Sequence, residues 1–337
     1  MRRAAPAPAA TVIISSYNYA KYIGDAIESA LACELDEGDL EILVADDGST
    51  DDTAEVVERY PRVRFLALEH GGKARAFRAA LARARGEILF TLDADDVYLP
   101  GRVATALEIY ERYPTVCHVS HPSLILDEAS GSQVVEELPS WLIGGPHDGN
   151  TVLARFYRRG VPFGGGSTFS ARAVSIARRP PSDRVDMLLD EYLVLASLAA
   201  GDTYFFPQPL STWRLHGANF STLVAAASES RERSHRFLSS QDGILDDIGD
   251  LEIQRPVREV LALRARAARA TLHALDGQRS LAEVLSLWRS LLALRPASIR
   301  TWLAVGRQYG VFSLSLPAGM VRAIRALRKR RSVQSRA

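Results

Sequence analysis

The sequence predicts an α/β fold with a doubly wound, mostly parallel sheet and a helical C-terminal extension. Short apolar or β-branched runs alternate four times with helical patterns in the first hundred residues, as expected of βαβ units. Several of these runs end abruptly at polar or acidic residues. After about residue 222 no strand pattern recurs and helical periodicity dominates. With 337 residues, the chain is long enough for one large domain and an appendage.

The first hundred residues are expected to form strands and helices in regular alternation. Ile23, Ile27 and Ala30 lie on one face of the first helix, and Thr50 or Asp51 is placed to cap the second. The expected order is strand 11–16, a helix reaching residue 33, strand 41–45, helix 53–59, strand 63–68, helix 73–85 and strand 87–92.

The later elements are less regular. Their expected order is helix 101–113, strand 116–119, a polar Gly- and Pro-rich loop over the sheet at 127–150, helix 151–159, a glycine-rich turn at 161–166 and an apolar helix at 184–200. The chain is therefore divided into a flexible N-terminal segment (1–9), a main domain (10–222) and a helical region with a basic tail (223–337).

Composition indicates an ordinary globular protein of a reducing compartment. Hydrophobic residues make up 47% and charged residues 24%, which argues against disorder. Two cysteines, Cys33 and Cys117, make no disulfide framework and suit the cytosol. The first ten residues lack the apolar core of a signal peptide, and no window has the roughly 18 apolar residues of a membrane span. We expect a cytoplasmic protein.

The C-terminal end is strongly basic and amphipathic. Residues 281–337 hold eleven Arg or Lys and a single acid, Glu283, among apolar anchors such as Trp288 and Trp302. Such segments commonly lie in the membrane interface, attracted to anionic lipid. A helical appendage packed on the main domain and a disordered basic end remain alternatives. No nucleic-acid recognition motif accompanies the tail.

A carboxylate cluster follows the fourth expected strand. Asp93, Asp95 and Asp96 come directly after an apolar run that should deliver them to the carboxyl edge of the sheet, where ligands bind in open α/β folds. Three negative charges so close together are costly unless a cation binds there, and the usual cation is a divalent metal on a phosphorylated ligand. A single Asp at this place could also be a helix N-cap.

Polar residues end two other strands and form a late motif. Tyr17, after Ser15 at the end of the first strand, could stack on a planar base, although an exposed loop tyrosine is equally ordinary. Asp46 and Asp47 end the second strand and suit either hydrogen bonds to a nucleotide or a turn with an N-cap.

A fourth block holds an arginine and a histidine more than a hundred residues later. On an extended segment, Arg214 and His216 are two apart and project to the same side, which suits a phosphate or a metal.

Together these blocks resemble the family 2 glycosyltransferases of the GT-A fold, over roughly residues 9–220. The resemblance implies a Rossmann-like nucleotide-binding half in the doubly wound sheet. It rests on four segments in the same order as in the family, namely residues 11–18, 45–53, 86–96 and 213–221.

The resemblance implies a nucleotide site at the ends of the first two strands. Tyr17 would pack near the base and Asp46 would recognise it, with Asp47 as its neighbour. Ser15 and Ala94 belong to the same donor-binding set.

The resemblance also implies a Mg²⁺ or Mn²⁺ site. Asp93 and Asp95 are similar to the family's pair of metal-associated aspartates, with Asp93 toward the ribose and Asp95 as the principal ligand. His216 would reach the metal or the pyrophosphate, and Arg214 would lie beside the departing phosphate. Asp96 is interpreted as a turn or capping residue.

Departures from the family pattern lie on the helix at 73–85. Relatives commonly carry Asn and Gly where this chain has Arg78 and Ala80. Arg75 and Arg78 could help to neutralise a pyrophosphate, or they could lie on a solvated helix face.

The catalytic base is carried over to Asp190. The family's Glu-Asp pair precedes an apolar helix, and here Leu189 replaces the Glu while Asp190 falls on the Asp. Glu191 is the second candidate for the base. A purely structural role for Asp190, as a helix cap, is the other alternative.

The expected function is an inverting, metal-dependent hexosyltransferase. It would move a sugar from a nucleotide-diphosphate sugar to a saccharide or lipid-linked acceptor, in the biosynthesis of cell-surface polysaccharide or glycoconjugate. We expect it in the cytoplasm, with the basic tail as a candidate for peripheral attachment to the inner face of the cell membrane. A catalytically impaired nucleotide-sugar-binding module of a membrane-associated polysaccharide assembly complex is the alternative. Nucleotidyl transfer and dinucleotide-dependent oxidation fit less well, because no glycine-rich loop follows the first strand.

Overall fold

A seven-stranded sheet forms the centre of the computed structural model, which describes residues 7–33, 38–159, 164–217, 219, 231–278 and 280–293. The strand order is β10-β6-β9-β4-β1-β2-β3, and only β9 runs antiparallel to its neighbours. The strands are β1 (Ala10–Ser16), β2 (Leu40–Asp46), β3 (Arg64–Ala67), β4 (Ile88–Asp93), β6 (Val116–Ser120), β9 (Ser170–Arg172) and β10 (Asp202–Phe205).

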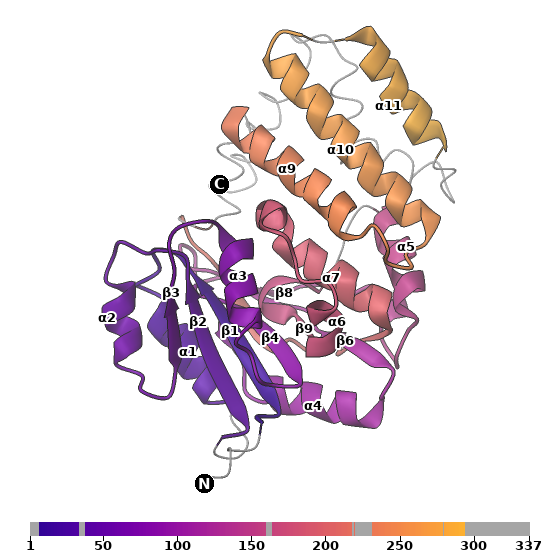
Figure 1. The fold of residues 1–337 in the computed structure, drawn as a ribbon. Helices are drawn as coiled ribbons and strands as arrows, with labels where there is room; N and C mark the ends of the chain where they lie inside the picture. Colours follow the sequence, from indigo (N-terminus) through magenta and orange to yellow (C-terminus); the bar gives the residue numbers. More distant parts are fainter. Residues whose placement is uncertain are drawn as a thin grey trace.

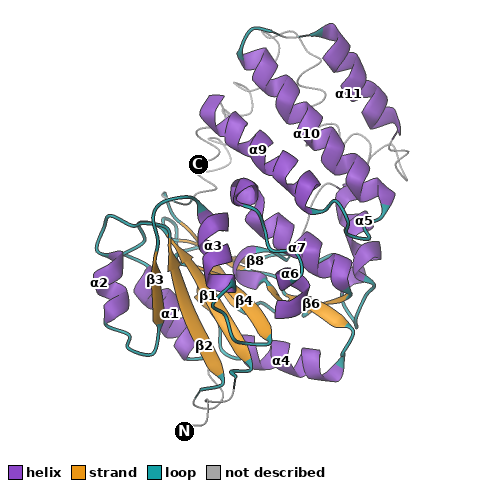
Figure 2. Ribbon diagram, in the orientation of Figure 1, coloured by secondary structure: helices purple, strands orange, loops and turns teal. Residues whose placement is uncertain are grey.

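Helices cover both faces of this sheet (Figure 2). Along β1, Val12 and Ile14 pack into one apolar cluster with α1 and α4, while Ile13 packs into a second cluster with α3, α5 and α7. Alternate side chains of a strand point to opposite faces, so the two clusters are the two halves of a doubly wound core. The helices are α1 (Ile23–Leu31), α2 (Thr53–Glu58), α3 (Lys73–Leu81), α4 (Arg102–Arg112), α5 (Gly149–Arg159), α6 (Ala173–Ala177) and α7 (Leu189–Ala200).

Strand register aligns the polar strand ends at one edge. Ser15 of β1 lies opposite Ala45 of β2 and Asp93 of β4, and Ser16 lies opposite Asp46. The carboxyl ends of three parallel strands therefore meet at the edge where open α/β sheets bind their ligands.

A second, four-stranded sheet flanks this edge. Its order is β5-β11-β7-β8, with β5 (Val97–Tyr98), β11 (Ser211–Leu215), β7 (Leu124–Asp127) and β8 (Gln133–Val135). The prediction of a plain loop over residues 127–150 was wrong, because this stretch contains β8 and the short 3₁₀ helix η1 (Ser140–Leu142). The three residues of β8, two of them Val, are all exposed and pair with β7 alone, and so short an edge strand gives little sequence pattern.

The predicted helix at residues 184–200 is two elements. A 3₁₀ helix, η3 (Asp183–Leu188), precedes α7, which begins at Leu189. The break sets the first turn of α7, with Asp190 and Glu191, apart from the segment that leads into it.

The C-terminal region is helical, as predicted. Figure 1 shows α9 (Arg231–Asp247), α10 (Arg255–Leu275) and α11 (Leu281–Ala293) beside one another, next to α5 and α7. Apolar residues of α9 and α10, such as Ile244 and Leu261, belong to the same core cluster as α7. The predicted boundary at 222/223 and the basic tail from residue 294 lie outside the described residues. No helix among those described is long and apolar enough to cross a membrane.

Candidate active site

The two aspartates at the end of β2 hold loops at the edge of the sheet. The buried carboxylate of Asp46 accepts hydrogen bonds from the Ser49 amide (2.9 Å) and hydroxyl. Asp47 Oδ1 accepts from the amides of Gly71 (2.8 Å) and Gly72 (3.0 Å), and Asp47 Oδ2 lies 2.9 Å from His70 Nδ1. Asp47 thereby anchors the loop that leads into α3.

A flat aromatic surface lies beside these aspartates. The Tyr17 ring stacks on the His70 imidazole with centroids 4.5 Å apart and an interplanar angle of 26°. Tyr17 is 42% exposed, so part of its ring is open to a planar ligand. His70 was missed from the sequence, because a single His in a loop gives no signal of its own.

A backbone hydrogen bond joins the end of β1 to the residue that follows β4. The Ala94 amide donates to the carbonyl of Ser15 (3.3 Å), and Ala94 is buried. These two predicted donor-binding residues therefore lie between the ends of β2 and β4.

Lys73 joins two carboxylates that are far apart in the sequence. Its Nζ lies 2.7 Å from Asp93 Oδ1 and 3.1 Å from Asp190 Oδ1. Burial opposes the charge of Lys73, but Asp190 and Asp93 raise the pKa of its ammonium above the ordinary value. Lys73 was also missed, although it is one of only three lysines in the chain and follows two glycines directly.

Asp190 lies in the first turn of α7, against a glycine segment. Burial raises the pKa of its carboxyl, Lys73 lowers it and Asp93 raises it, with a net shift upward. A Cβ at Gly165 would lie 3.0 Å from Asp190 Cβ, and one at Gly166 would lie 3.4 Å from Asp93 Oδ2. Glycines at these positions let the backbone approach both carboxylates closely.

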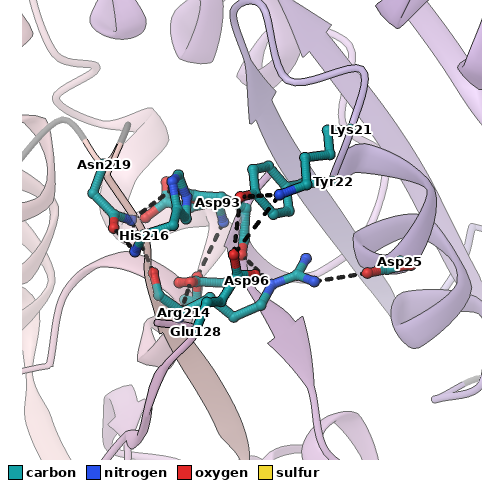
Figure 3. Close-up of polar contacts among 11 residues, drawn as sticks. Lys21, Tyr22, Asp25, Asp93, Asp96, Glu128, Arg214, His216 and Asn219 are labelled. Carbon is teal, nitrogen blue, oxygen red and sulfur yellow. Dashed lines mark hydrogen bonds and ion pairs between the residues drawn. The ribbon is translucent and has the colours of Figure 1, made fainter. Parts of the chain in front are cut away.

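Asp95 meets His216 on the other side of Asp93. Asp95 Oδ2 lies 3.2 Å from His216 Nε2 and accepts a hydrogen bond from Asn219 Nδ2 (3.1 Å). The His216 ring stacks on Tyr22 with centroids 4.5 Å apart (Figure 3). Burial raises the pKa of the Asp95 carboxyl above its usual range, and the charge of Asp93 raises it further.

Asp96 and Arg214 tie this cluster to its surroundings. The buried Asp96 carboxylate accepts from Ser167 Oγ (2.6 Å) and from the Arg214 amide (3.0 Å). Arg214 lies over the Tyr22 ring, donates to the Asp95 carbonyl and pairs with Asp25 at 2.7 Å (Figure 3). Its Nη2 is buried without a hydrogen-bond partner among the described residues.

The donor set fits a divalent cation. Among the described residues, no three His, Cys, Asp or Glu side chains are already arranged to hold a metal, because Asp93 faces Lys73. Asp95 and His216 do lie together; carboxylate oxygen suits Mg²⁺ and Mn²⁺, and imidazole nitrogen suits transition metals.

Three residues considered from the sequence as possible site residues lie elsewhere. Glu191 pairs with Arg264 of α10 (Oε2 to Nη2, 2.8 Å) and accepts from the Tyr157 hydroxyl (2.5 Å), with 9% of its side chain exposed. Arg75 is 4.0 Å from Glu69 on the surface, and Arg78 pairs with Asp183 at 2.8 Å. The structure brings none of these three to the Asp93 cluster.

The chain is similar to known glycosyltransferases. Residues 11–168 match the family described as glycosyl transferase family 2. An uncharacterized glycosyltransferase of Nostoc sp. is 30% identical over 237 residues, which cover 66% of this chain and 69% of that protein.

Two solved structures share the fold. The crystal structure of S. aureus TarS 1–349 in complex with UDP-GlcNAc superposes with a TM-score of 0.59 at 14% identity, covering 90% of this chain and 87% of that one. The mannosyltransferase PcManGT from Pyrobaculum calidifontis, in complex with GDP-Man and Mn²⁺, gives a TM-score of 0.50 at 22% identity, covering 91% and 81%.

Proposed function

Because the chain belongs to glycosyltransferase family 2 and is a glycosyltransferase with the GT-A fold, we propose that it is an inverting, metal-dependent enzyme acting on a nucleotide-diphosphate sugar. One observation carries this proposal. Lys73 holds the carboxylate of Asp190 beside Asp93, at the edge where Asp95 and His216 also lie. A metal-type carboxylate cluster and a candidate base thus share one site.

The donor would lie across the ends of β1, β2 and β4. Its base would pack on the Tyr17–His70 stack, next to Asp46. TarS in complex with UDP-GlcNAc and PcManGT in complex with GDP-Man support this class of donor. The buried, unpartnered Nη2 of Arg214 is a suitable donor for a phosphate oxygen.

Asp95, with Asp93 and His216, would hold a Mg²⁺ or Mn²⁺ ion. When bound, such an ion supplies positive charge that stabilises the diphosphate leaving group. Asp93 would then exchange part of its contact with Lys73 for the cation.

Asp190 would accept the proton of the acceptor hydroxyl as that oxygen attacks the anomeric carbon. Lys73 contacts the Asp190 carboxylate, which favours its ionised form and orients it. One displacement with one base and no enzyme nucleophile inverts the anomeric configuration. Glu191 has no part in this step, because Arg264 and Tyr157 occupy its carboxylate.

The acceptor is proposed to be a saccharide or lipid-linked saccharide used in building cell-surface polysaccharide or glycoconjugate. A cytoplasmic location, with peripheral attachment to the inner face of the membrane through the basic tail, would bring the site to such acceptors.

Replacing Asp190 tests the proposed function. Asp190→Asn keeps the shape but removes the base, so transfer from nucleotide sugars with Mn²⁺ or Mg²⁺ should fall by about 100-fold or more. The rise in melting temperature on adding donor and metal should persist, since donor binding does not need the base. Asp242→Asn, on the surface of α9, is the matched control.

Turnover by Asp190→Asn at the normal rate would exclude Asp190 as the base. A wild-type protein that is stabilised by nucleotide sugar yet transfers to no hydroxyl acceptor would point instead to the catalytically impaired binding module.

A further inference from the structure

We propose that helices α9 and α10 of the C-terminal region are part of the active centre, and that Arg264 is a positioning residue for Asp190. This inference rests on the proposed role of Asp190 as the base. It extends that role, because Arg264 lies on α10, outside the strand ends and loops that carry the candidate site.

Asp190 has little to hold it in place by itself. Among the described residues its carboxylate makes hydrogen bonds to Lys73 alone, and 44% of its side chain is exposed. Its direction therefore depends on how the first turn of α7 is placed and rotated.

Glu191, the next residue, holds the first turn of α7 through contacts on another face of the helix. Arg264 contacts both carboxylate oxygens of Glu191, and the Tyr157 hydroxyl adds a third hydrogen bond. The side chains of Arg264 and Glu191 are 8% and 9% exposed, so each charge is matched within the protein and the two-pronged geometry is restrictive.

The two acidic side chains are coupled by helix geometry. Consecutive residues of an α-helix point roughly 100° apart around the axis. With Glu191 directed at α10, the carboxylate of Asp190 is turned toward Lys73. A rotation of this turn that released Glu191 would also move Asp190 away from its position beside Asp93.

Helix α9 holds the segment that precedes Asp190. Four side chains of α9 contact residues 182–187, through Asp247 to the Ser182 amide (2.8 Å), Ser240 to the Met187 amide (3.1 Å), Arg236 to Asp186 (2.7 Å) and Asp246 to Arg184 (2.5 Å). The segment held by α9 lies directly beside the residue that precedes Lys73, because a Cβ at Gly72 would collide with the carboxylate of Asp186. Both partners of the Lys73–Asp190 contact are thus supported by the C-terminal helices.

Replacing Arg264 in the full-length chain tests the positioning role. Arg264→Met should lower kcat by about 10- to 100-fold, because small misplacements of a reacting group cost rate steeply. The KM for donor, and the rise in melting temperature with donor and metal, should change less than twofold. Arg264→Lys should recover part of kcat. Arg269→Met is the matched control, since Arg269 is on the same helix and pairs with Asp242 on the surface.

A double variant separates positioning from stability. Glu191→Met combined with Arg264→Met replaces the buried pair by apolar groups, which commonly restores stability. We expect its melting temperature to return toward wild type while kcat stays at least tenfold low. Recovery of kcat along with stability would overturn the proposal, as would an Arg264→Met enzyme with the kcat of the Arg269→Met control.

If Arg264→Met fails to fold, Arg264→Lys and the double variant carry the same test. The two proposals fail in different ways. Normal turnover by Asp190→Asn would refute the assignment of Asp190 as the base. An inactive Asp190→Asn enzyme, together with unchanged kcat in the Arg264 variants, would refute only the positioning role of Arg264.

Discussion

Lys73 connects the carboxylate cluster at the end of β4 with the candidate base on α7. It lies at the first position of α3 and reaches Asp93 of β4 on one side and Asp190 of α7 on the other. Neither carboxylate contacts the other through a hydrogen bond in the described residues, so the ammonium is the link. Its positive charge counters the burial that raises the pKa of Asp190.

Removing this charge should alter the pH dependence of the reaction. Lys73 lowers the pKa of Asp190, so Lys73→Met should raise that pKa further. A base works only when ionised, and activity falls as pH drops through its pKa. The acid limb of the kcat/KM profile should therefore move to higher pH, with kcat/KM at neutral pH lowered about tenfold or more.

Lys21→Met is the control for this profile, because Lys21 is a surface lysine paired with Glu128 and with the Tyr22 hydroxyl. An acid limb that stays in place in Lys73→Met would mean that a group other than Asp190 sets it.

At the scale of elements, the loop between β3 and α3 must pass very close to η3. Gly72 adopts a φ of +99° and leaves no room for a Cβ beside Asp186. Asp47 accepts hydrogen bonds from the amides of Gly71 and Gly72 and so fixes the start of α3. The position of Lys73 follows from this loop.

Gly72→Ala should therefore destabilise the protein by roughly 1–3 kcal/mol, from the strained backbone and the displaced η3. Denaturant unfolding measures this value. Gly131→Ala is the control, because Gly131 has a φ of +70° but nothing within 4 Å of a built Cβ.

Gly131→Ala should show the backbone cost alone, about 1 kcal/mol. If both variants lose the same free energy of unfolding, η3 moves away from the added Cβ at Gly72 without a measurable cost.

At the scale of the whole molecule, the C-terminal region is proposed to have two roles, one in holding the candidate site and one in membrane attachment. Of the described part, α9 and α10 pack into the same apolar core as α5 and α7, and α11 lies against α10. Residues 294–337 carry ten of the eleven Arg or Lys found after residue 280, and the proposed membrane contact depends on them.

Vesicle sedimentation checks this contact. The full-length chain should pellet with vesicles rich in anionic lipid, less so at high salt, because the attraction between charges is screened. A chain ending at residue 293 keeps α11 and should remain in the supernatant. Pelleting of both chains to the same extent would contradict a role for the tail.

The sequence by itself determined that the polar ends of the first strands meet at one edge of the sheet, where the donor is proposed to bind. Strand–helix alternation predicted parallel strands, and Asp46 and Asp93 at the ends of two of them had to reach the same edge, because the pairing of parallel strands aligns their carboxyl ends. These inferences needed local pattern alone. The family blocks added Asp95, Asp190 and His216 as candidates.

Only the tertiary structure decided which partners these side chains have. The Lys73–Asp190 contact joins residues 117 apart in the sequence, and Glu191 meets Arg264 from 73 residues away. Such pairs depend on how helices pack and rotate, which periodicity does not specify. For the same reason two adjacent acids that were rivals in the sequence, Asp190 and Glu191, point to opposite partners in the fold.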